Sequence, residues 1–130
     1  MVRQLINLDS WDWILIVYYN AGPDDILEIL RTLQRFGCSN QYLERAKQNL
    51  SGDMLDTGLT YTNEEAHGTV MVISKASNPG EFWNTLDHEK GHAAKHIAEA
   101  LGLACSGEEV QYLTGELAKE MYPIARNYIR

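Results

Sequence analysis

Two histidines stand four positions apart in the sequence, at His88 and His92, and an acidic residue, Glu89, follows the first of them. On an α-helix, residues four apart lie on one face, with about 6 Å of rise between them. Two imidazole nitrogens at that spacing can both reach one zinc ion at the roughly 2.0–2.1 Å that zinc requires. This H-E-x-x-H pattern therefore predicts a zinc site on a helix.

Glu89 has a chemical role in the same pattern. Its carboxylate can point past the metal toward a bound water molecule and take a proton from it. Zinc lowers the pKa of its bound water toward about 7, which makes a nucleophile available at neutral pH. We therefore predict that Glu89 is the general base in a metal-assisted hydrolysis.

A catalytic zinc ion needs a third protein ligand and an open position. Glu108 and Glu109 lie in the first turn of the predicted last helix, and a chain reversal after Gly102 would bring that turn near the two histidines. One glutamate would then bind the ion while the other caps the helix or faces solvent. The simpler alternative is that both are first-turn acids favoured by the helix dipole.

Two further histidines are interpreted as supporting residues. His96 continues the four-residue series, but it lies about 12 Å of helix rise from His88, so one ion cannot bind both. The eleven-residue pattern that uses a third histidine needs a glycine turn after the second one, and this chain has none there. We interpret His96 as a supporting or surface residue and His67 as a loop residue.

A peptidase also needs a group that stabilises the oxyanion of its tetrahedral intermediate. Tyr112 is the first candidate, because it follows the proposed third ligand by one helical turn, although a core position is an equally simple role for it. Tyr61 and His67 are the alternatives. Asp87 or Glu116 could hold the second nitrogen of a ligand histidine and fix its tautomer, and we favour Glu116.

Hydrophobic periodicity and turn residues predict the elements that position this site. We expect, in order, a strand at 11–19, a helix from about 24 that stops at Gly37, a helix from about 39 to 49, strands at 59–62 and 69–74 joined by a hairpin loop, a helix at about 81–101 that stops at Gly102, and a last helix capped by Ser106 that runs to about 122, where Pro123 should kink or interrupt it. The order β-α-α-β-β-α-α predicts an α+β fold, with a short mixed or antiparallel sheet packed on helices.

The bulk properties exclude several classes of protein. Residues 1–130 suit a single domain. A net charge of -7 without a basic stretch argues against nonspecific nucleic-acid binding. The longest apolar run, Trp13 to Tyr19, is too short to span a bilayer, and the N-terminus lacks the apolar core of a secretory signal. Cys38 and Cys105 are expected to be reduced core thiols, with a single bridge as the alternative. The absence of a secretory signal favours the cytoplasm.

The segment from Leu86 to Pro123 resembles the gluzincin type of zincin metallopeptidase, and within it the ImmA/IrrE-type family. His88-Glu-Lys-Gly-His92-Ala-Ala-Lys-His96 is similar to that family's helix pattern, H-E-x-G-H-x-x-x-H. The run from Glu109 to Leu117 is similar in register to the pattern E-A-N-x-F-A-A-E-L-L-x-P of the following helix, with the proline somewhat late. The resemblance covers roughly the last 55 residues of the chain.

This resemblance implies a small intracellular zincin-like domain in which Glu109 is the third zinc ligand. It also implies that Thr69 to Ser74 is the edge strand beside the cleft, where a substrate peptide adds as a further strand. The expected function is zinc-dependent hydrolysis of peptide bonds, with Glu89 as general base.

The chain departs from the family at two positions. Lys90 stands where active zincins usually have an uncharged residue, and Gln111 replaces an asparagine. These changes leave the metal ligands intact but bear on proteolysis. The alternative is therefore a catalytically inactive zincin-fold module that binds a protein partner, and a phage or mobile-element protein of this architecture fits the pattern equally well.

Overall fold

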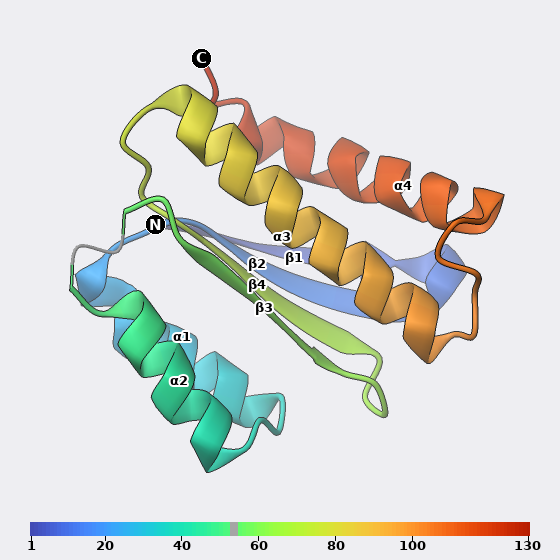
Figure 1. Ribbon diagram of the computed structural model, residues 1–130, viewed down its shortest axis with the longest axis horizontal. Helices are drawn as coiled ribbons and strands as arrows, with labels where there is room; N and C mark the ends of the chain where they lie inside the picture. The colour runs from blue at the N-terminus through green and yellow to red at the C-terminus, as the bar shows by residue number, and fades with distance from the viewer. Residues whose placement is uncertain (53–54) are drawn as a thin grey trace.

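The computed structural model describes residues 1–52 and 55–130, and it places a mixed sheet between two pairs of helices (Figure 1). The elements are β1 (Val2–Leu8), β2 (Trp13–Ala21), α1 (Ile26–Arg35), α2 (Asn40–Leu50), β3 (Gly58–Asn63), β4 (Gly68–Ser74), α3 (Pro79–Ala100) and α4 (Glu108–Ala125), with 3₁₀ turns at Asp9–Trp11 and Pro23–Asp25. The predicted α+β class is confirmed.

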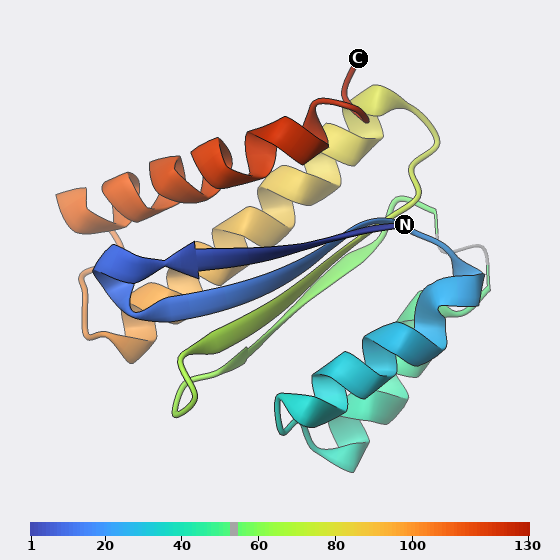
Figure 2. The same cartoon turned by 180° about the vertical axis from the view of Figure 1, so that it is seen from behind.

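The four strands lie in the order β1-β2-β4-β3. The central pair, β2 and β4, is parallel, and each edge strand pairs antiparallel with its neighbour. Helices α3 and α4 cover one face of the sheet, and α1 and α2 cover the other (Figures 1 and 2). Because the central strands are covered on both faces, they read as almost continuous apolar runs.

The prediction that Thr69 to Ser74 form the edge strand beside the cleft is wrong. Residues Thr69 to Ser74 belong to β4, which lies inside the sheet between β2 and β3. All of its residues are buried, since helices cover both faces and strands pair with both edges. The edge strand next to α3 is β3, whose residues are mostly half-buried.

Strand β1 was not predicted from the sequence, so the observed order is β-β-α-α-β-β-α-α. Its inner residues Ile6 and Leu8 are buried, whereas Leu5 is 54% exposed. This is the period-two pattern of a strand with one covered face. The alternation spans only the end of a short edge strand, and the polar residues before it hide the signal.

Most predicted helix ends are confirmed. Ser39 caps α2, because its hydroxyl accepts a hydrogen bond from the Tyr42 backbone N–H at 3.1 Å. Gly37 and Gly102 end their helices with φ angles of 83° and 71°, which glycine adopts without strain.

Two details of α4 and one of the cysteines differ from expectation. The residue that precedes α4 is Gly107 rather than Ser106, and it makes no side-chain cap. Pro123 lies in the last turn and does not interrupt the helix, which continues to Ala125. Both cysteines are free, but only Cys38 is buried, so a core thiol is confirmed for that residue alone.

Helix α3 buries one face and exposes the other, which positions the predicted site. Phe82, Leu86, Ala93 and Ile97 pack into the core that α3 and α4 form with the sheet. The remaining face of α3 is exposed along the middle of the helix. Within the described residues, none of the helices combines the length and apolarity that crossing a bilayer requires.

Candidate functional site

His88 and His92 lie on the exposed flank of α3, and their imidazoles converge. The two Nε2 atoms are 3.1 Å apart, with the rings nearly perpendicular at a centroid distance of 4.6 Å. For an ion held about 2.0–2.1 Å from each nitrogen, the N–ion–N angle would be about 100°, near the tetrahedral value. The same separation suits an N–H···N hydrogen bond between the rings, so these two interactions are alternatives for one pair of atoms.

Glu89 follows His88 on the helix, but its side chain is buried against β3. Its side chain is only 6% exposed, and its Oε1 accepts a hydrogen bond of 2.8 Å from the Thr60 hydroxyl. Gly58 makes room for it, since a Cβ there would lie 2.7 Å from the Val72 carbonyl oxygen and 2.9 Å from Cγ of Glu89. The edge strand therefore holds this carboxylate in place.

A cavity of about 270 Å³ lies between β3 and α3, and His88 and Glu89 both line it. The rest of its lining is small or polar and comes from Asp56, Thr57, Gly58, Asn84 and Thr85. A water molecule or a small polar group in this hollow would therefore meet both an imidazole and a carboxylate.

His96 ends a chain of hydrogen bonds that crosses the sheet. Trp13 Nε1 donates to Thr69 Oγ1, which bonds Thr62 Oγ1, which in turn bonds His96 Nδ1, each at 2.9 Å. Burial, and then the neighbouring His92, lowers the pKa of His96, so the ring is neutral near pH 7. Its ring lies 6.1 Å from that of His92, which agrees with a supporting position.

The structure does not bring Glu108 or Glu109 to the histidine pair. Among residues 1–52 and 55–130, no group of three or more His, Cys, Asp or Glu side chains is placed to share a metal ion. The reason is the packing of α4, which meets α3 on the flank of Leu86 and Lys90. His88 and His96 lie on the opposite flank, toward β3.

The other candidates on and near α4 have different partners. Tyr112 is 69% exposed and does not line the cavity, so it lies on the surface and not in the core. Glu116 accepts a hydrogen bond from Trp11 Nε1 at 2.9 Å rather than holding a histidine. Asp87 pairs with the buried Lys90 at 3.0 Å, so that unusual cation is neutralised away from the imidazoles.

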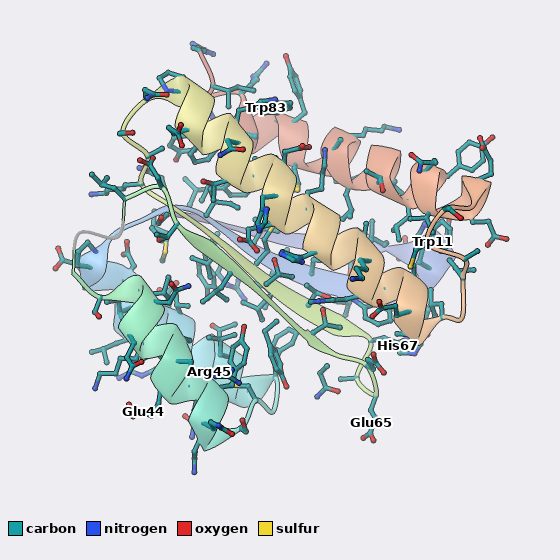
Figure 3. All side chains as sticks on the ribbon, viewed as in Figure 1. Trp11, Glu44, Arg45, Glu65, His67 and Trp83 are labelled. Carbon is teal, nitrogen blue, oxygen red and sulfur yellow. The ribbon has the colours of Figure 1, made fainter. Side chains whose placement is uncertain are left out.

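Tyr61 and His67 are likewise held elsewhere. Tyr61 packs against Tyr42 on the other face of the sheet, with ring centroids 4.9 Å apart. His67 lies at the turn between β3 and β4 (Figure 3) and stacks on Trp13 at 4.8 Å. Sequence reasoning missed Thr60 and Gly58, because their contacts with Glu89 join segments about thirty residues apart.

Replacing Thr60 with Val is expected to destabilise the fold by about 1.5–3 kcal/mol, the usual cost of losing a hydrogen bond to a charged group. Valine keeps the volume of threonine but removes the donor to the buried Glu89. Urea unfolding measures the change, with Thr60→Ser as the variant that keeps the hydroxyl. Equal losses in Thr60→Val and Thr60→Ser would show that this hydrogen bond is not what matters.

Comparisons with known proteins give no match: no family model matches the chain, and no curated protein or solved structure is significantly similar to it. The resemblance of the α3–α4 segment to zincins therefore stays a prediction. What the site can do has to be inferred from its geometry.

Proposed function

We propose that this protein is a zinc-dependent, peptidase-like hydrolase whose site is built on α3 and the edge strand β3. The observation that carries the proposal is the convergence of the Nε2 atoms of His88 and His92 at 3.1 Å, beside the cavity that His88 shares with Glu89. Two imidazoles and a nearby carboxylate are the donor set and the base that metal-assisted hydrolysis uses.

The two imidazoles fit two adjacent positions of a tetrahedral zinc ion. The described residues supply no third protein ligand, so the remaining positions are open to water or to groups of the substrate. When bound, zinc supplies a Lewis acid that polarises a carbonyl group and acidifies water.

The role of Glu89 follows from how β3 holds it. Thr60 occupies Oε1, while Oε2 lies next to Gly58, at the cavity that both residues line. A carboxylate fixed by one oxygen can take a proton from water in the cavity with the other and return it to the leaving amine.

The substrate in this proposal is an extended peptide. Strand β3 lies at the edge of the sheet and borders the cavity. A peptide can add to such an edge through main-chain hydrogen bonds, which would carry its backbone past Glu89. This moves the proposed substrate strand from β4 to β3.

The proposal is tested by incubating the protein with a mixture of peptides, with added zinc and with a chelator, and identifying products by mass spectrometry. We expect cleavage with zinc and none with the chelator. Cleavage that the chelator leaves unchanged, or no cleavage at any zinc concentration, would refute the proposed activity.

The second candidate function is a catalytically inactive module of the same fold that binds a protein partner. The specific observation in its favour is the absence of a third ligand among the described residues, since catalytic zinc sites use three. Zinc binding without peptide cleavage in the same assay would select this function.

A further inference from the structure

Two hollows lie on opposite sides of one short stretch of β3. The first is the cavity on the α3 side, which touches Thr57 and Gly58. The second, of about 540 Å³, lies on the α2 side and touches Leu59. Its other lining residues all come from α2 and are Tyr42, Arg45, Ala46, Gln48 and Asn49. Consecutive residues of the edge strand thus border hollows on opposite faces of the sheet.

The backbone of β3 between these hollows faces outward. The Ser74 N–H donates to the Thr57 carbonyl oxygen at 3.0 Å, and antiparallel pairs alternate between hydrogen-bonded and non-hydrogen-bonded positions. Gly58 and Thr60, opposite Ile73 and Met71, therefore direct their N–H and C=O groups away from β4. Groups at this two-residue spacing are those that an added strand would pair with.

The present partners of these outward groups are weak. Asn49 Nδ2 donates to the Gly58 carbonyl and Tyr42 Oη to the Thr60 carbonyl, each at 3.4 Å. Both bonds are roughly half an ångström longer than typical ones. Both donors also line the α2 hollow, so an incoming peptide would replace them without breaking strong bonds.

The α2 hollow has a definite chemistry. Among the residues that the structure describes, Arg45 is the one charged residue that lines it, and amides and a phenol surround it; Figure 3 shows Arg45 on α2, across the sheet from α3. A guanidinium binds a carboxylate through two parallel hydrogen bonds. Successive side chains of an extended chain point to opposite faces, so neighbouring residues of a bound peptide would enter the two hollows.

We propose that β3 binds an extended peptide with an acidic side chain in the α2 hollow, next to Arg45, and with the adjacent residue in the cavity beside Glu89. The proposal rests on the proposed function only in treating that peptide as a substrate. The binding itself requires neither zinc nor cleavage, so it also applies to the inactive module.

Fluorescence anisotropy tests it with labelled peptides that scan Glu, Gln or Lys through every position, added to the wild-type protein in a metal chelator. At one position we expect Glu to bind about tenfold more tightly than Gln. The variant Arg45→Gln should lose that preference, and Arg45→Glu should favour Lys at the same position. Arg31→Glu, an exposed change on α1 of equal charge, should leave the preference intact.

Three results would overturn the proposal: no peptide binds, no position prefers an acidic residue, or Arg45→Glu and Arg31→Glu change the preference equally. Circular dichroism confirms that each variant is folded. Binding with the expected preference but no cleavage on adding zinc would refute the peptidase and leave this inference standing. Cleavage without any acidic preference would do the reverse.

Discussion

Replacing Glu89 with Gln is expected to lower the rate of peptide cleavage by about 10²–10⁴-fold, the usual contribution of a general base, while zinc binding is retained. Glutamine keeps the size of the side chain and can still accept the hydrogen bond from Thr60. It cannot take a proton from water. The cleavage rate and the bound zinc are measured on the same preparation.

Glu99→Gln is the matched control, because Glu99 is an exposed acid on the same helix and does not line the cavity. It should leave cleavage and zinc binding unchanged. If Glu89→Gln cleaved peptides as fast as the wild type, Glu89 would not be the base. If it lost zinc as well, its carboxylate would be needed for the metal rather than for proton transfer.

Replacing Ile97 with Ala is expected to lower the free energy of unfolding by about 2–5 kcal/mol. Ile97 is fully buried in the core that α3 and α4 share with the sheet, and its truncation leaves a cavity that rigid neighbours only partly fill. The loss matters for the site, because this packing fixes how α3 turns its histidines outward. Denaturant unfolding, followed by fluorescence of the buried Trp13, measures it.

Lys95→Ala provides the comparison on the exposed side of the same helix. Its effect should stay within about 0.5 kcal/mol, as is usual for surface changes. If the two variants were destabilised equally, the stability of α3 would not depend on its inner face, and packing of that face would not be what orients the histidines.

Local patterns in the sequence were enough to predict much of this fold. The periodicity of α3, the Ser39 cap and the glycines at 37 and 102 all act within one or two helical turns, so their consequences can be read from neighbouring residues. Strand β1 was not predicted because its alternation of apolar and polar residues is short. The position of β4 inside the sheet depends on which strand pairs with which, and no local pattern carries that information.

The features of the site also separate into those that local spacing determines and those that depend on contacts between distant segments. The convergence of His88 and His92 follows from helical spacing alone, and the structure shows it. The proposed third ligand required α4 to pack beside the imidazoles, but the apolar residues of α4 and the stem of Lys90 place it on the other flank. Gly58 and Thr60 contact Glu89 across distant segments of the chain. The spacing of residues along the sequence cannot predict such contacts.

A calorimetric titration of the purified protein with zinc tests the proposed site most directly. We predict one zinc ion per chain for the wild type. His88→Ala and His92→Ala should each lower the affinity for zinc by at least about 100-fold, which is more than the loss of a residue that only supports a ligand usually costs. His67→Ala, which changes a histidine outside α3, should bind as the wild type does. If the wild-type protein bound no zinc, or if either variant kept the wild-type affinity, His88 and His92 would not form a zinc site.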